Sequence, residues 1–183
     1  MTCIVGWLDQ NKRIAYLGGD SAGVDSSYNI RVRKDIKVFE KSKMLIGYTS
    51  SFRMGQLLRF ELSIPRYNEL KDIYEYMCTD FIDAVRKCLK TGGYSKITNN
   101  EETIGSFLVI FKGRIFEIES DLQIGEIEDN FNSIGCGANY ALGTCYALDK
   151  KFDGREAIKI ALSSASRYSS GVRSPFNVIE IRY

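Results

Sequence analysis

The order of the predicted strands and helices is the feature that most restricts the fold of this 183-residue chain. Helical patterns occur in pairs between groups of strands, whereas a doubly wound parallel sheet alternates single helices with single strands. The paired order favours two antiparallel sheets that stack on each other and carry helices on both outer faces. We therefore expect an α+β fold, a four-layer αββα sandwich, formed by one domain spanning residues 1–183.

Hydrophobic periodicity and turn residues place the individual elements. Strand patterns are predicted at residues 3–7, 13–20, 28–32, 36–39 and 43–50, then twice within 106–120, and finally at 176–183. Helical spacing is predicted for 51–62, 70–89 and 154–169, and the stretch 131–149 is predicted to form a strand, a glycine-rich turn and a helix.

Charge and hydropathy exclude several function classes. No apolar run approaches the roughly 18 residues that a membrane span needs, and the N-terminus lacks the pattern of a signal peptide. The 25 Lys and Arg residues barely exceed the 23 Asp and Glu residues, and the densest basic group, near residues 31–37, is interspersed with acidic residues. We therefore expect a cytoplasmic protein that binds neither membranes nor nucleic acid.

The chain contains no histidine. This absence excludes every Ser–His and Cys–His mechanism and every histidine metal site. The five cysteines form no CxxC pair, so we expect reduced thiols and no zinc site. If the protein is a hydrolase, its base must be a carboxylate, a lysine or the amine of the chain itself.

Five segments of the chain resemble, in order, segments of the β-type subunits of proteasomes, a family of N-terminal nucleophile hydrolases, and the bacterial HslV branch is the most similar. These segments are "TCIVGW", "GGDSAGV", "DIKVFE", "LIGYTSSFRMGQLL" and "IGCGANYALG". The resemblance covers nearly the whole chain and identifies it as a divergent member. It implies the αββα fold and a threonine-type peptidase that needs no cofactor or metal.

The resemblance implies a catalytic role for four residues. Thr2 would be the nucleophile, Lys37 would favour its alkoxide, Asp20 would orient Lys37, and the backbone N–H of Ser50 would donate to the oxyanion. Removal of Met1, without any propeptide, would give Thr2 a free α-amine. The reference pKa of such an amine, about 7.7–8.0, suits a general base and fits a protein without histidine.

Other residues would support this site or bind substrate. Cys136 stands where the family has a serine in a Gly-Ser-Gly turn, and a thiol is the weaker hydrogen-bond donor. Ser170 matches a further serine of the family, although the family's aspartate in that stretch has no counterpart here. Tyr48 and Phe52 flank the oxyanion turn and would line a shallow pocket for small or medium apolar side chains.

Each residue also has an ordinary explanation when it is taken alone. A threonine at position 2 is common, Asp20 could cap a turn, and Lys37 could be a solvated surface charge. Ser50 could be a helix N-cap, and Cys136 could be a small buried residue. The combination of these residues favours the catalytic interpretation.

The resemblance also implies partners. We expect peptide or unfolded-protein substrates, a homo-oligomeric ring that encloses the sites, and an AAA+ unfoldase ATPase that serves it. The helix after Ser50, with Met54, Leu57 and Leu58, would contribute to the contact between protomers. Two alternatives stay open, a small-molecule amidase of the same mechanistic class and a non-catalytic assembly subunit.

Overall fold

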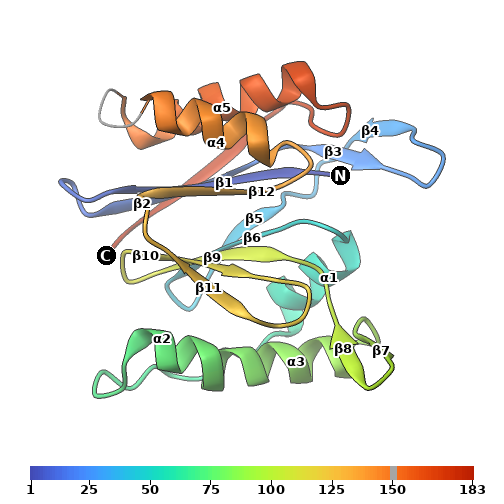
Figure 1. Ribbon diagram of the computed structural model, residues 1–183, viewed down its shortest axis with the longest axis vertical. Coiled ribbons are helices and arrows are strands. Elements are labelled where there is room, and N and C mark those ends of the chain that lie inside the picture. The colour runs from blue at the N-terminus through green and yellow to red at the C-terminus, as the bar shows by residue number, and fades with distance from the viewer. Residues whose placement is uncertain (149–151) are drawn as a thin grey trace.

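The computed structural model describes residues 1–148 and 152–183 of the chain. Two antiparallel sheets lie face to face, and helices cover the outer face of each sheet (Figure 1). The four-layer αββα arrangement expected from the paired helices is thus confirmed.

Each sheet is antiparallel throughout. The first sheet has the strand order β12 (Phe131–Gly135), β1 (Cys3–Asp9), β2 (Ile14–Gly19) and β13 (Asn177–Arg182). The second has the order β11 (Ile124–Ile127), β10 (Arg114–Ile118), β9 (Phe107–Phe111), β6 (Met44–Tyr48) and β5 (Val38–Lys41). Two separate hairpins are formed by β3 (Ala22–Val24) with β4 (Ile30–Val32), and by β7 (Lys96–Thr98) with β8 (Glu101–Thr103).

The helices form the two outer layers (Figure 1). The layer on the first sheet contains α4 (Ala138–Leu148) and α5 (Gly154–Tyr168). The layer on the second sheet contains α1 (Phe52–Gln56), the π-helical turn η1 (Leu57–Glu61), α2 (Ile73–Tyr76), the π-helical turn η2 (Met77–Phe81) and α3 (Ile82–Thr91). Within the described residues, no helix is both long and apolar enough to cross a bilayer.

Three hydrophobic clusters hold the four layers together. One lies between the two sheets and includes Ile4 and Leu17. A second packs the first sheet against α4 and α5, and the third packs the second sheet against α1 to α3. Because apolar residues of both sheets are buried on both faces, each sheet contributes to two of these clusters.

Most of the predicted elements are confirmed with small shifts of their ends. The stretch 70–89 forms one helical segment, from Ile73 to Thr91, with a π-helical turn inside it. The hairpin β7–β8 and the edge strand β11 were not predicted from the sequence.

The apolar residues of the helix after Ser50 face their own protomer. Met54, Leu57 and Leu58 are buried in the core between this helix and the second sheet. These three side chains therefore pack within the protomer. Phe60 of the same helical segment is exposed, and the contribution of this helix to a contact between protomers stays a prediction.

The sheet topology brings several strand ends to one side of the sandwich. Cys3 at the start of β1 pairs with Gly135 at the end of β12, and Ile4 pairs with Gly19 at the end of β2. The candidate site lies at this end, close to the N-terminus (Figure 1).

Candidate active site

Thr2, Asp20 and Lys37 meet where β1 begins, β2 ends and β5 begins. Lys37 Nζ donates to Thr2 Oγ1 at 2.9 Å and to Asp20 Oδ1 at 2.8 Å. All three residues are buried, with Thr2 only 4% exposed. The sequence placed these residues in one site, and the structure brings them into hydrogen-bonding distance.

Asp20 is held by backbone donors as well as by Lys37. Its Oδ1 accepts from Cys3 N–H at 3.0 Å, and its Oδ2 accepts from Ala22 N–H at 2.8 Å and Arg173 N–H at 3.2 Å. A buried carboxylate needs such partners, since an unpaired charge inside a protein is costly. Asp20 therefore connects β1, β2 and the segment before β13 in addition to orienting the lysine.

Lys37 is a buried ammonium rather than a solvated surface charge. Burial lowers the pKa of Lys37, and the attraction of Asp20 acts in the opposite direction. The side chain can thus supply a positive charge that is not shielded by water next to the Thr2 hydroxyl.

Ser50 lies on the other side of Thr2, in the turn between β6 and α1. Its φ of 63° falls in the left-handed region, which glycine adopts more readily than serine. Its side chain accepts a hydrogen bond from Ser106 N–H at 3.3 Å. Within the part of the chain that the structure describes, its backbone N–H has no acceptor, so this donor is available to a ligand.

The helix N-cap is the next residue, Ser51, whose side chain accepts from Arg53 N–H at 3.1 Å. The ordinary explanation of Ser50 as the N-cap is therefore wrong.

Cys136 contacts the backbone of Thr2 from the turn after β12. Its Sγ accepts from Thr2 N–H at 3.3 Å and donates to the Thr2 carbonyl at 3.4 Å. The side chain is exposed, which contradicts the interpretation of Cys136 as a small buried residue.

Ser169, rather than Ser170, supports this thiol. Ser169 Oγ lies 3.4 Å from Cys136 Sγ, whereas Ser170 is exposed in the following turn. The assignment of Ser170 as a supporting residue is therefore corrected by one position. The cause is the end of α5 at Tyr168, which leaves Ser169 as the C-cap that faces Cys136.

Gly135 is required by the close approach of Thr2. Its φ is 98°, and a Cβ at this position would lie 2.2 Å from the Thr2 carbonyl oxygen. Any side chain here would displace the backbone that presents the threonine.

A small cavity of about 40 Å³ opens beside the Thr2 hydroxyl. Thr2, Lys37, Ser50, Tyr48 and Phe52 contribute to its lining. Met1 also lines it, and the two aromatic rings pack edge to face with centroids 6.0 Å apart.

Contacts with α1 and with Arg33 hold the two aromatic rings in place. Tyr48 packs against Gly55 of α1 in the core, so a Cβ on that glycine would collide with the tyrosine ring. The guanidinium of Arg33 lies 3.8 Å from the centre of the Phe52 ring and pairs with Asp35 at 2.7 Å. Sequence reasoning missed Arg33 and Asp35, because nothing local indicates that they reach Phe52.

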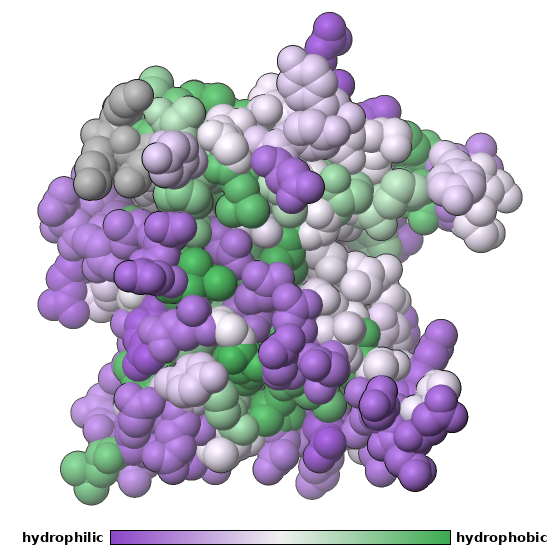
Figure 2. All heavy atoms as spheres, in the orientation of Figure 1, coloured by the Kyte–Doolittle hydropathy of each residue, from purple (hydrophilic) through white to green (hydrophobic). Residues whose placement is uncertain are grey.

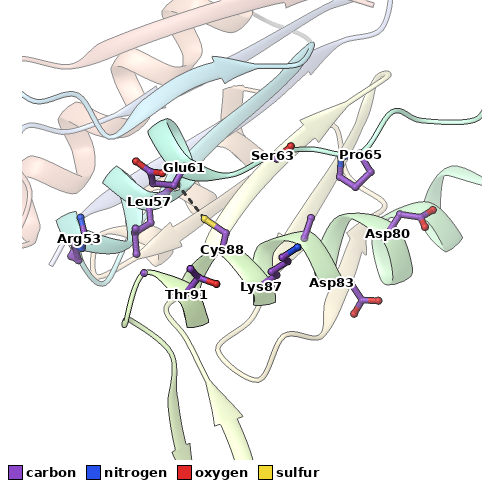
Figure 3. A pocket seen from close by; sticks show the side chains of 12 residues that line it. Arg53, Leu57, Glu61, Ser63, Pro65, Asp80, Asp83, Lys87, Cys88 and Thr91 are labelled. Atoms are coloured by element: carbon purple, nitrogen blue, oxygen red, sulfur yellow. Dashed lines mark hydrogen bonds between the residues drawn. The ribbon is translucent and has the colours of Figure 1, made fainter.

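A larger cavity lies elsewhere. It has a volume of about 710 Å³ and is formed between η1 and α3, with Leu57, Glu61, Lys87 and Cys88 in its lining (Figure 3). The Cys88 thiol points to η1 and donates to the Leu57 carbonyl at 3.5 Å, and burial raises its pKa. Such a thiol is a poor nucleophile, so the small cavity at Thr2 is the better candidate for catalysis.

The described residues contain no cluster of three or more Cys, Asp or Glu side chains suited to a metal ion. The chemistry available at Thr2 is that of a hydroxyl beside a buried ammonium. With Met1 attached, the Thr2 nitrogen is an amide, and the hydroxyl donates to the Met1 carbonyl.

Comparison with solved structures identifies the fold. BPH from Thiobacillus denitrificans, in complex with epoxomicin, matches with a TM-score of 0.75 at 16% identity, over 99% of this chain and 98% of BPH. HslV from Trypanosoma brucei matches with a TM-score of 0.69 at 16% identity, over the full length of both chains. Anbu, described as an ancestral β-subunit, from Yersinia bercovieri matches with a TM-score of 0.62 at 17% identity, over 98% of this chain and 81% of Anbu.

No family model and no curated protein matches the sequence. The structural matches confirm the resemblance to HslV for the fold, and the 16% identity marks this chain as divergent.

Proposed function

We propose that this protein is a threonine-type peptidase in which Thr2, freed from Met1, is the nucleophile. The observation that carries the proposal is the buried chain of hydrogen bonds from Asp20 through Lys37 to the Thr2 hydroxyl, with distances of 2.8 Å and 2.9 Å. The fold shared with HslV and with BPH, which was solved with epoxomicin bound, supports it further.

The reaction follows from the groups around Thr2. The free α-amine accepts the hydroxyl proton while Oγ1 attacks the scissile carbonyl carbon, and the Ser50 N–H donates to the oxyanion that forms. The protonated α-amine of Thr2 then gives its proton to the leaving amine as the C–N bond of the substrate breaks, which leaves an ester on Thr2. A water molecule deprotonated by the amine attacks this ester and releases the carboxylic acid.

Lys37 and Asp20 act on the nucleophile without exchanging protons with the substrate. The positive charge of Lys37 stabilises the alkoxide character of Oγ1 and disfavours protonation of the nearby amine. Cys136 would contact that amine, since it already accepts from the Thr2 nitrogen, and Ser169 would orient the Cys136 thiol. Tyr48 and Phe52 would form the wall of the primary substrate pocket.

Self-assembly belongs to this proposal. A reactive N-terminus that cleaves peptides must be kept away from folded cellular proteins. A closed homo-oligomeric ring, which an AAA+ unfoldase supplies with substrate, would enclose the sites in this way. Light scattering at micromolar concentration should give the mass of at least six subunits, and a monodisperse monomer of 20.7 kDa would contradict this part of the proposal.

The decisive experiment is covalent labelling. Epoxomicin, an epoxyketone, needs both a hydroxyl and a free amine on one residue, so it should add once to the peptide that begins with Thr2. Thr2→Ala should lose both labelling and turnover, Thr2→Ser should keep part of both, and Thr98→Ala, an exposed threonine on β7, should behave as wild type. Labelling of Thr2→Ala, or its turnover at the wild-type rate, would overturn the proposal.

A peptide panel and a panel of acylated metabolites then distinguish the substrate classes. Cleavage of peptides supports the peptidase, and cleavage of the acylated metabolites alone supports the small-molecule amidase. Failure of both, in protein that begins with Thr2, supports the non-catalytic assembly subunit.

A further inference from the structure

Three hairpin turns and the end of β13 surround a second cavity, with a volume of about 510 Å³. The turns connect β1 to β2, β5 to β6 and β9 to β10. Thr2 precedes β1 and the first of these turns follows it, so the seven residues of β1 separate the cavity from Thr2 by roughly 20 Å. In Figure 1 this end of the sandwich lies at the C-terminus, opposite the N-terminus.

Four cationic side chains line this cavity: Arg13, Lys43, Lys112 and Arg182. Lys112 pairs with Glu69 at 3.0 Å. Among the residues that the structure describes, Arg13, Lys43 and Arg182 form no ion pair. In Figure 2, hydrophilic side chains gather over this end of the sheets. The cavity thus carries an excess of positive charge that the protein does not neutralise.

The backbone conformation of these cations is unusual. Arg13, Lys43 and Lys112 have φ values of 53°, 62° and 47°, all in the left-handed region. Hairpin turns normally place glycine or asparagine in this conformation, because a long side chain destabilises it. Three turns around one cavity each carry a cation in this conformation, at positions where glycine would fit the backbone better.

The inner lining is apolar. Ala15, Ile110 and Ile181 form part of it, together with Phe111 and the ring of Tyr183. The Arg13 guanidinium lies 5.9 Å from the centre of the Tyr183 ring. A ligand that fits both surfaces needs a charged end and an apolar or aromatic end.

We propose that this cavity binds a soluble organic phosphate with more than one negative charge. The phosphate groups would lie among Arg13, Lys43 and Arg182, and the organic part would contact the apolar lining. Several cations favour a polyvalent anion over a single carboxylate, and guanidinium groups bind phosphate oxygens in pairs. The volume falls within the roughly 300–1,000 Å³ typical of small-molecule sites. The inference does not rest on the chemistry of Thr2.

Replacement of the cations by glycine provides a sharp test. Arg13→Gly and Lys43→Gly, made together in the full chain, remove two charges and also relieve the left-handed backbone. The thermal unfolding temperature without ligand should therefore stay the same or rise, while the affinity for ATP, measured by calorimetry, should fall roughly tenfold or more. An unfolding temperature that is unchanged or higher, together with a lower affinity for ATP, distinguishes loss of the binding site from loss of folding.

Three probes and two controls complete the design. ATP should bind more tightly than pyrophosphate, because its organic part contacts the apolar lining. Adenosine should not bind, because the phosphate charge provides most of the attraction. Arg31→Ala with Lys34→Ala removes two cations near the other end of the sandwich and should leave ATP affinity unchanged. Glu69→Gln should tighten ATP binding by freeing Lys112, whereas Glu101→Gln on β8 should not.

The proposal fails if ATP shows no saturable binding at millimolar concentration, or if both pairs of cation variants weaken it equally. Binding of phosphoinositide vesicles in the absence of any binding of ATP or pyrophosphate would assign the site to a membrane surface and overturn the soluble ligand.

Discussion

Lys37 Nζ lies 2.9 Å from Thr2 Oγ1, and both side chains are closed off from solvent. This contact gives the threonine hydroxyl a positive neighbour in a region where water does not screen the charge. Asp20, at 2.8 Å from the same ammonium, fixes the direction from which the charge acts.

Removal of the ammonium should stop catalysis. We expect Lys37→Met to lower kcat/KM for a peptide substrate by at least about a hundredfold, because the alkoxide loses its stabilising charge. Asp20 keeps its three backbone donors, so the variant should still fold. Lys34→Met, at an exposed lysine, is the matched control and should retain wild-type rates. Wild-type rates in Lys37→Met would exclude the proposed role of the lysine.

The lowered pKa of Lys37 should appear in the pH dependence of stability. Burial lowers the pKa from its usual value of 10.5 in the folded state. Between the folded pKa and 10.5 the unfolded chain therefore binds more protons than the folded chain, so the contribution of Lys37 to stability rises with pH in this window. We expect the free energy of unfolding of wild type, relative to Lys37→Met, to increase from neutral pH towards about 10.5. Urea unfolding at several pH values measures this difference, and a decrease would show that the folded pKa is raised instead.

The layers of the fold follow from local sequence patterns, and the core of the site follows from the family resemblance. Paired helices between groups of strands indicate the αββα order, and the Lys112–Gly113 turn correctly divides 106–120 into β9 and β10. Thr2, Asp20 and Lys37 could be placed together through the resemblance to proteasome β-type subunits, and the structure brings them into hydrogen-bonding distance.

The missed features depend on tertiary contacts or on weak local patterns. The β7–β8 hairpin has mostly exposed side chains, so hydrophobic alternation gives no signal, although Asn99 and Asn100 supply the left-handed turn. The choice between Ser169 and Ser170 depends on where α5 ends, and the ends of helices are the least certain part of a prediction. The stacking of Arg33 on Phe52 is created by the fold and has no local signature.

The thiol of Cys136 should make the proposed activity sensitive to alkylation. Cys136 is exposed next to the Thr2 nitrogen, whereas burial raises the pKa of Cys3 and of Cys145 to about 12. Iodoacetamide should therefore modify Cys136 before the two buried thiols and inactivate wild type, since the added group occupies the space around the amine.

Cys136→Ser should be active and resistant to the reagent, because a hydroxyl keeps the hydrogen bonds at this position. Peptide mass mapping against residual activity makes the comparison. Equal inactivation of wild type and Cys136→Ser would place the sensitive thiol elsewhere.

The narrow cavity beside Thr2 should restrict the substrate. Tyr48 and Phe52 line this cavity, which holds about 40 Å³ while Met1 also lines it. Because the two rings remain after Met1 is removed, wild type should prefer small or medium apolar side chains before the scissile bond. Tyr48→Ala should raise kcat/KM for large apolar side chains relative to small ones, measured on a peptide panel at low temperature. Tyr76→Ala removes another buried tyrosine from the same core cluster and should lower stability without changing relative rates. Unchanged relative rates in Tyr48→Ala would show that this ring serves packing alone.

The free amine of Thr2 should decide whether the protein is active. With Met1 attached, the Thr2 nitrogen is an amide that donates to Cys136 Sγ and cannot accept a proton, so the base is missing although Lys37 and Asp20 are in place. We expect the mass of active protein to correspond to a chain that begins at Thr2. Protein released from a cleavable fusion directly at Thr2 should hydrolyse peptides, whereas the same protein with one extra glycine before Thr2 should fold and assemble equally but lose turnover. Because the two forms differ only in acylation of one nitrogen, activity of the glycine-extended form would show that the base is another group and that the proposed mechanism is wrong.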